Sequence, residues 1–338
     1  MNSVEVTTVS LLGIDVSKDT LDLALQPDDR KRPYEREVRN DASGVARLQA
    51  WVKERGCELS ELTVVMEATG VYHERVAQTL YDAGCKVIVA NPKRVRDYAA
   101  GLGLVHKTDK VDARALVRYG KEMGSELVSW SPPPEEVRIL RALYDRLSAV
   151  QEDLQRELNR RDQAAVSREP ALVINSLDSS IARLRLECER LKRAIEDHFD
   201  QHPGLKAQRE LLQSIPSIGP VSGDLLLCLL LAHRFGSARQ AAAFCGLIPR
   251  AHQSGTSVRK PARLTKQGDA ELRAKLYMAA VVATRHNSEL RQIYQALLAA
   301  GKSKMSALGA LMRRLLHIAY GVLKHQAPYS AKLALPSA

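Results

Sequence analysis

The sequence predicts an α/β domain followed by a long helical part. Three observations lead to this fold class: the first 130 residues alternate short apolar runs with amphipathic stretches, a central region carries heptad seams, and the rest is rich in helix-forming residues. With 338 residues, the chain is long enough to build more than one core. We predict domains over residues 1–130, 131–205 and 206–326, with a frayed tail over 327–338.

The first domain is predicted to be a mixed sheet with helices on its faces. The segments VSLLGIDVSK and TLDLALQ are strand-like, and YEREVRN alternates polar and apolar residues, so together they predict a three-stranded meander. A helix over 42–55, the strand LTVVMEATG, a helix over 73–83, the strand KVIVANP and helices from Pro92 onward are expected to follow. This order of elements is that of the RNase H fold.

Two long helices are predicted in the central region, after the proline-rich break WSPPPEE. Their apolar residues recur at alternating spacings of three and four, which is the heptad seam of a coiled coil. Pro170 separates the seams, so the helices form an antiparallel hairpin or an intermolecular coiled coil, or pack on their own domain; we favour dimerisation. The seams consist of Val137, Leu140, Tyr144, Leu147, Gln151, Leu154 and Leu158, and of Ile174, Leu177, Ile181, Leu184, Cys188, Leu191, Ile195 and His198.

The third domain begins with a pattern typical of a helix-hairpin-helix. In IPSIGPVSGDLLLCLLLAH, glycine and proline mark a turn between two apolar helices, and such a turn offers backbone N–H groups to phosphate oxygens. A plain glycine-capped helical turn fits the same residues. The segment GLIPRAHQSGTSVRKPARLTKQGDAELR is cationic and predicted to be loop-like, with helices beyond it to about Lys324.

The charge of the chain favours a polyanionic partner. Lysine and arginine number 50 against 39 acidic residues, giving a formal charge of +11, and nucleic acid is the commonest polyanion. The sequence has no apolar run long enough to cross a membrane and starts with the polar MNSVEVTTVS, so we expect a cytoplasmic protein with no membrane partner. The cysteines lack zinc spacing and are predicted to be reduced and mostly buried: Cys57, Cys85, Cys188, Cys228 and Cys245.

Four carboxylates form the candidate catalytic centre. Asp15 lies in an apolar strand and Glu67 ends another, where a buried carboxylate is costly and favours a cation as its partner. Asp109 and Asp112 are three residues apart in HKTDKVDARAL, a spacing that puts both on one helix face. The four acids predict a site for Mg²⁺ or Mn²⁺ that supports in-line phosphoryl displacement. Taken singly, each acid would instead be a solvated charge or a helix cap.

Cationic residues accompany the acids, and we predict that they hold the nucleic-acid backbone. A first group lies in NPKRVRDYAAG and just before Asp109, where any one residue alone would fit a solvated helix face. A second group lies in the cationic segment of the third domain. The two groups are Lys93, Arg94, Arg96 and Lys107, and Arg250, Arg259, Lys260, Arg263 and Lys266.

Several motifs in order resemble one protein family. GIDVSK, MEATGVYHERVAQTL, VIVANPKRVRDYAAGLG and HKTDKVDARAL resemble the successive motifs of the DEDD transposases of the IS one-ten insertion-sequence family, which is related to the Piv DNA invertases. LLQSIPSIGPVSGDLLL, FCGLIPRAHQSGTS and LTKQGDAELRAKLYMAA resemble that family's C-terminal transposase domain. The resemblance extends from about Leu11 to Leu323, nearly the whole chain.

The resemblance implies a RuvC-like first domain in which the four acids bind metal, and a nucleophilic serine at Ser254 in the third domain. Ser-Gly is also an ordinary turn dipeptide, and a shift of register would move the role to Thr256 or Ser257. The family further implies guidance by a bridge RNA, transcribed from the end of the element, that pairs with donor and target DNA. We therefore predict RNA-guided DNA strand exchange through a covalent phosphoserine by a homo-oligomer, either a dimer or a tetramer.

Two other functions fit the residues. A RuvC-like metal-dependent nuclease or resolvase would use the same four acids with water, and Ser254 would have no role. A helical scaffold that only binds nucleic acid would need none of the acids. The actin-like ATPases share the underlying fold, but glycine pairs such as Gly101 and Gly103 do not make a phosphate-binding loop.

Overall fold

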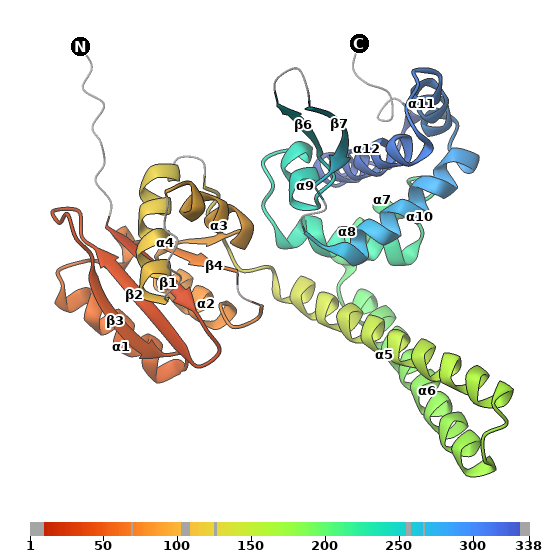
Figure 1. Ribbon diagram of the computed structural model, residues 1–338, viewed down its shortest axis with the longest axis horizontal. Coiled ribbons are helices and arrows are strands. Elements are labelled where there is room, and N and C mark those ends of the chain that lie inside the picture. The colour runs from red at the N-terminus through yellow and green to blue at the C-terminus, as the bar shows by residue number, and fades with distance from the viewer. Residues whose placement is uncertain are drawn as a thin grey trace. The chain divides into compact units, whose positions relative to one another are not determined.

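The described part of the chain folds into two compact units, Met1–Pro132 and Pro133–Ala338 (Figure 1). The computed structural model describes residues 10–68, 70–102, 109–124, 127–254, 258–265 and 268–331, with the backbone alone at 109–111, 250–254 and 258–262. Lys107 and Lys266, two of the predicted cationic contacts, lie outside these ranges, as do Thr256 and Ser257. Within these ranges, none of the helices is long and apolar enough to span a membrane.

A five-stranded mixed sheet forms the centre of the first unit in the described residues. Strands β1 (Leu11–Val16), β2 (Thr20–Gln26) and β3 (Tyr34–Arg39) pair antiparallel as a meander, and β4 (Thr63–Glu67) and β5 (Lys86–Ala90) continue parallel to β1. The strand order is β3-β2-β1-β4-β5. The mixed α/β sheet and the order of elements predicted from the sequence are confirmed.

Helices cover both faces of this sheet (Figure 1). Along β1, Leu12, Ile14 and Val16 pack in one core with α1 (Ala42–Glu54) and α2 (Glu74–Asp82), near the short 3₁₀ turn Leu59–Glu61. Leu11 packs on the opposite face, with α3 (Pro92–Gly101) and α4 (Asp109–Met123). Because successive strand residues point to opposite faces, this division assigns every residue of β1 to one side.

The two heptad seams of the second unit pack on each other within one chain. Helices α5 (Glu135–Val166) and α6 (Ala171–Gln201) form an antiparallel hairpin. At one end the ring of His198 is 2.8 Å from the carbonyl oxygen of Glu136, and at the other Arg161 pairs with Asp178 at 2.7 Å. The hairpin is one of the arrangements that the sequence allowed, and dimerisation through it remains a prediction.

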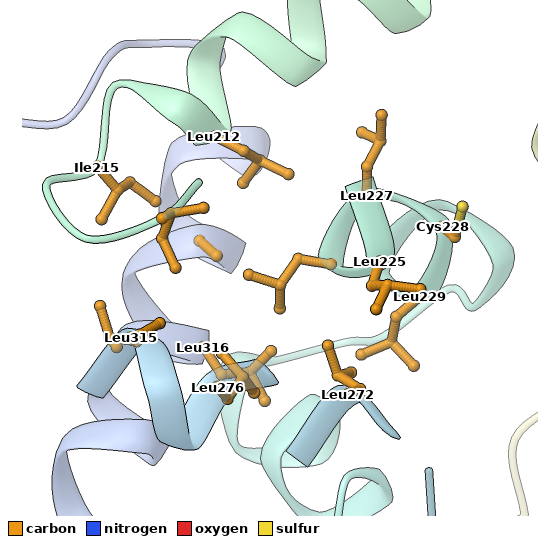
Figure 2. Packing of buried hydrophobic residues seen from close by; sticks show 14 of the residues in the cluster. Leu212, Ile215, Leu225, Leu227, Cys228, Leu229, Leu272, Leu276, Leu315 and Leu316 are labelled. Atoms are coloured by element: carbon orange, nitrogen blue, oxygen red, sulfur yellow. The ribbon is translucent and has the colours of Figure 1, made fainter. Parts of the chain in front are cut away.

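The remaining helices of the second unit enclose a leucine-rich core. Figure 2 shows Leu212, Leu225, Leu276 and Leu316 gathered there from four different helices. The helices are α7 (Pro203–Gln213), α8 (Pro220–Ala232), α9 (Ala238–Phe244), α10 (Ala270–His286), α11 (Ser288–Ala299) and α12 (Lys304–His325). The backbone N–H of Tyr329, within the predicted frayed tail, donates to the Ser214 hydroxyl at 2.8 Å, which fixes the chain just beyond α12.

The segment predicted to be loop-like is instead a β-hairpin. Strands β6 (Pro249–Ser254) and β7 (Val258–Leu264) pair antiparallel, with a bulge between Arg250 and His252. The prediction was wrong because the cationic composition hid the strand signal. Strand pairing needs only backbone N–H and carbonyl groups, and it leaves charged side chains free to point to solvent.

The five cysteines are buried and form no disulfide, so the prediction that they are mostly buried is confirmed. Burial disfavours the thiolate and raises the pKa of both Cys228 and Cys245 to about 12. These thiols are therefore protonated and unreactive at neutral pH.

A buried carboxylate on α8 ties four helices of the second unit together. Asp224 is fully buried and accepts two hydrogen bonds from the Arg209 guanidinium, at 2.9 and 3.0 Å, and one from the Tyr144 hydroxyl. Arg209 also binds Glu196 of α6 at 2.7 and 2.8 Å. Burial raises the pKa of Asp224, and the bonds from Tyr144 and Arg209 oppose that rise.

We expect Arg209→Met to destabilise the second unit by about 3–5 kcal/mol, because the Asp224 carboxylate would stay buried without its guanidinium partner. Urea unfolding followed by circular dichroism measures the change. Lys206→Met on the same helix is the matched control, since Lys206 pairs with Asp200 at 2.7 Å on the exposed surface. The Lys206→Met variant should unfold at close to the wild-type urea concentration, because an exposed ion pair contributes little to stability. Equal losses in the two variants would contradict the role given to Asp224.

Candidate active site

Asp15 and Glu67 lie side by side on two parallel strands. β1 and β4 pair with Ile14 opposite Met66, so the residues that follow, Asp15 and Glu67, stand at the same level. Neighbouring strands are about 4.8 Å apart. Both acids are half-buried. The strand residues next to them pack in the core with α1 and α2, so the two acids point to the opposite face of the sheet, which α4 covers. The structure therefore brings these two predicted residues together.

Helix α4 crosses the sheet very close to β1. A Cβ atom on Gly13 would lie 2.2 Å from the carbonyl oxygen of Ala113, and only glycine permits this approach. In register with Gly13 stand Val65 on β4 and Ala24 on β2, and both belong to the core on this face. Further along α4, a Cβ on Gly120 would lie 2.7 Å from Val65 and 3.3 Å from Leu11. The helix therefore runs antiparallel to β1, with its first turn toward Asp15.

This direction places the two helical acids near the strand acids. Asp112 directly precedes Ala113, and position 109 lies one turn before it. One helical turn advances about 5.4 Å, and two strand residues about 6.6 Å, so the first turn of α4 stands level with Asp15 and Glu67. The Asp112 side chain is half-buried, and the structure describes only the backbone of Asp109.

The first cationic group lies at the same edge of the sheet. Ala90 at the end of β5 is the register partner of Glu67, and α3 begins two residues later. The Asn91 side chain caps this helix by accepting from the backbone N–H of Lys93 at 2.9 Å. Lys93 also pairs with Asp97 at 3.0 Å, whereas Arg94 and Arg96 extend to solvent. These side chains lie at the edge where Glu67 ends its strand.

Ser254 ends strand β6 at the tip of the β-hairpin, opposite Val258. Two of the predicted cationic positions, Arg250 and Arg263, stand opposite each other across the same hairpin, and a third, Arg259, stands opposite the neutral Gln253. Lys260 stands opposite His252. The described positions of the second predicted group and the predicted serine are thus carried by one small element.

The base of this hairpin is anchored to the helical core. A Cβ on Gly309 of α12 would lie 3.3 Å from Leu264, so the helix passes directly beneath β7. Asp269, just after the hairpin, caps α10 by accepting from Leu272 N–H at 3.0 Å, and it pairs with Arg141 of α5 at 3.1 Å. The position of Ser254 therefore depends on α5, α10 and α12.

A turn over residues 214–219 joins α7 to α8, where the sequence predicts a helix-hairpin-helix-like element or a plain glycine-capped turn. The N–H of Gly219 donates to the Ser222 hydroxyl at 3.1 Å, which caps α8 from within. Ser217 adopts φ 85°, a left-handed conformation that is costly for a residue with a Cβ. The turn borders an open cavity of about 520 Å³, lined also by Lys275, Met278 and Val282 of α10. A contact to phosphate at this turn remains a prediction.

One acid beside the centre was missed in the sequence. Asp22 on β2 is the register partner of Asp15 and is buried, at 8% exposure. The turn between β1 and β2 could have indicated this acid. The Ser17 N–H donates to the Thr20 carbonyl oxygen at 3.0 Å and closes a tight turn, which sets Asp15 opposite Asp22. Without the register of its partner strand, Asp22 in TLDLALQ fits an ordinary polar residue of a strand.

The acids on this face fit a divalent metal by their chemistry. Carboxylate oxygens are the ligands that Mg²⁺ and Mn²⁺ prefer. Among the side chains that the structure describes, no group of three His, Cys, Asp or Glu residues forms a ready-made metal site. Asp109, the acid closest to the start of α4, contributes no side chain to that set. Asp15, Glu67 and Asp112, with Asp109, are the residues that would hold the ion.

Known sequence families match both units. A profile of DEDD transposases of the IS110 type, described as "Transposase", matches residues 12–166, and one described as "Transposase IS116/IS110/IS902 family" matches residues 209–295. The chain belongs to this transposase family. The first match includes all four acids, and the second includes the hairpin with Ser254, so the family identified from the sequence motifs is confirmed.

Two relatives match this IS110-family transposase over most of its length. The pilin gene-inverting protein of Moraxella bovis is 29% identical over 324 residues, covering 95% of this chain and 98% of the relative. The transposase for insertion sequence element IS1111A of Coxiella burnetii is 25% identical over 349 residues, covering 95% and 91%. A solved structure, T. thermophilus RuvC in complex with Holliday junction substrate, superposes with a TM-score of 0.26 and 16% identity over 35% of this chain and 97% of RuvC, which assigns nothing by itself.

We expect Gly13→Ala to destabilise the first unit of the transposase by about 1–3 kcal/mol, because the added methyl group would collide with the α4 backbone. Thermal unfolding followed by circular dichroism measures this. Gly101→Ala is the matched control, since a Cβ there meets no atom within 4 Å. It should be neutral or stabilising by up to about 1 kcal/mol. A Gly13→Ala protein as stable as the wild type would refute the close approach of α4.

Proposed function

We propose that this IS110-family transposase cleaves, exchanges and rejoins DNA strands at the ends of an insertion sequence, using the acid centre and Ser254. The observation that carries the proposal is the pairing of Asp15 and Glu67 in register beneath the first turn of α4, which holds Asp112. In a mixed sheet, acids gathered at the carboxyl ends of parallel strands are typical of a phosphoryl-transfer site.

The four acids have a shared role at the scissile phosphate. A divalent ion bound by them would neutralise charge on the phosphate and lower the barrier to displacement. The sheet register sets the backbone positions of Asp15 and Glu67, and the contact of α4 with Gly13 sets that of Asp112, which supports a shared role for these acids. The family and the acid chemistry support this assignment.

The Ser254 hydroxyl is the proposed nucleophile. Its Oγ forms a bond to phosphorus while the bond from phosphorus to one sugar oxygen breaks; the serine loses its proton to solvent and the leaving sugar oxygen gains one. Attack by a sugar hydroxyl of the other DNA then forms a new sugar–phosphate bond and releases the serine. Because one phosphoester replaces another at each step, rejoining needs no ATP.

The cationic positions around Ser254 suit a nucleic-acid backbone. Arg250 with Arg263, and Lys260 opposite His252, line the hairpin that carries the serine. Phosphates between such positions would relieve the repulsion of like charges across the strand pair. We propose donor and target DNA as partners, together with a bridge RNA encoded by the element, as the family resemblance implies.

A water-dependent nuclease is the second candidate, favoured by the acid centre, which does not itself require the serine. The two functions differ in the product, since only the serine mechanism leaves protein attached to DNA.

We expect a covalent protein–DNA adduct on a denaturing gel when labelled element-end DNA is incubated with the transposase, Mg²⁺ and RNA transcribed from the element's flank. Ser254→Ala should abolish the adduct, because the attacking oxygen is gone. Asp112→Asn should reduce it by roughly 100-fold or more, as expected for loss of a metal ligand. Thr256→Ala and Ser257→Ala test the register of the serine, and Asp97→Asn is the surface control; all three should keep the adduct.

Free nicked DNA without an adduct, unchanged in Ser254→Ala, would establish the nuclease instead. An adduct that persists in Ser254→Ala and disappears in Thr256→Ala or Ser257→Ala would move the nucleophile to that neighbour.

We further expect an acid-deficient chain to be rescued by a serine-deficient one. The acids and Ser254 belong to separate compact units, so one subunit's acids can act with another subunit's serine. Mixing Asp112→Asn and Ser254→Ala proteins should restore strand exchange to a measurable fraction of the wild type. If each variant stays inactive in the mixture while wild-type mixtures work, the acids and serine of a single chain act together.

A further inference from the structure

The acid centre is part of a longer row of carboxylates across the sheet. In register at one level stand Asp15 on β1, Asp22 on β2 and Glu37 on β3, and Glu67 continues the row on β4. Residues paired across strands point to the same face, so the row lies on the side of α4. Ala24, two residues after Asp22, belongs to the core under α4 and confirms the side.

Asp22 occupies the inner part of this row. It is 8% exposed, whereas Glu37 on the outer strand is exposed. Helix α4 spans this part of the sheet, since Ala113 lies over Gly13 and the next residue, Arg114, pairs with Glu35 on β3. Gly13, Ala24 and Glu35 are in register with one another, and each lies two residues along its strand from an acid of the row. Since Ala113 lies over Gly13, the preceding first turn of α4 lies level with Asp22.

The position of Asp22 has an electrostatic consequence. Side chains paired directly across an antiparallel ladder have Cβ atoms about 4.5–5.5 Å apart, and two carboxylates there repel. Asp22 is therefore one strand spacing from Asp15, as Glu67 is on the other side. A cation beside Asp15 would interact with both neighbours, and burial strengthens that attraction because the local dielectric is low.

We propose that Asp22 is a fifth carboxylate of the metal centre, a positioning residue that raises the affinity for the divalent ion held by Asp15, Glu67, Asp109 and Asp112. The inference rests on the proposed function, because it needs a metal at those acids. Asp22 adds negative charge beside Asp15 and restricts where the Asp15 carboxylate can turn. Groups in this supporting position change metal affinity by about 10–100-fold when they are removed.

The test is a Mn²⁺ titration of the full chain without nucleic acid, followed by electron paramagnetic resonance of the free ion. Asp22→Asn, which keeps the shape and removes the charge, should weaken binding by about 10-fold or more. Asp22→Glu should retain most of the affinity. Glu37→Gln is the matched control: it lies in the same row, one strand further out and exposed, and should change affinity less than about twofold.

Asp15→Asn separates the two proposals. If Asp15→Asn loses Mn²⁺ while Asp22→Asn binds like the wild type, the role of Asp22 is wrong and the acid centre stands. If Asp15→Asn binds like the wild type, the acid centre itself is wrong, and the role of Asp22 falls with it. If Asp22→Asn and Glu37→Gln weaken Mn²⁺ binding equally, the change reflects the general negative charge of the surface, and the proposal is overturned.

Folding of each variant is checked by urea unfolding in EDTA. Asp22→Ser, which is small and neutral, replaces Asp22→Asn if the amide does not fold. As a second readout, the rise in melting temperature on adding Mn²⁺ should be smaller in the Asp22 variant than in Glu37→Gln, because at a given Mn²⁺ concentration a more weakly bound ion stabilises the folded state less.

Discussion

The close approach of α4 to β1 at Gly13 is the constraint on which the first unit depends. With no Cβ at this position, the carbonyl of Ala113 lies on the strand itself, and the helix cannot shift without losing that contact. The contact sets the height and direction of α4, so it determines which acids meet. Asp112 comes to Asp15 and Glu67 through backbone packing, and the sheet register then supplies Asp22.

The second unit solves a similar positioning problem with a buried ion pair. Asp224 joins α8 to Arg209 of α7 and Tyr144 of α5, while Arg141, also on α5, pairs with Asp269 beside the serine hairpin. Buried pairs of this kind stabilise little in total but are costly to break on one side, which favours a single arrangement of the helices. The rigid base of the hairpin follows from this network and from Gly309.

The sequence predicted the layers of the fold because periodicity and turn residues encode them locally. It also singled out Asp15 and Glu67 as candidate metal ligands, since each is a lone carboxylate in an apolar strand. Asp22 was missed because its meaning depends on strand register, which arises from pairing and not from the residue's own neighbours. The hairpin of Ser254 was missed for a related reason, since cationic residues in a two-stranded ribbon have no buried face to produce an apolar alternation. Asp224 was missed because it precedes a run of leucines, and such a run indicates an apolar core helix.

Both functional elements place like charges opposite one another. Acids stand in a row across β4, β1, β2 and β3, and Arg250 stands opposite Arg263 across β6 and β7. Like charges that face each other across a strand pair repel. In the proposed mechanism, a divalent ion would offset the first repulsion and a phosphate backbone would offset the second, so the nucleoprotein complex would relieve both. Both repulsions would then be offset together only when the ion and the nucleic acid are bound, which is the state in which the proposed strand exchange takes place.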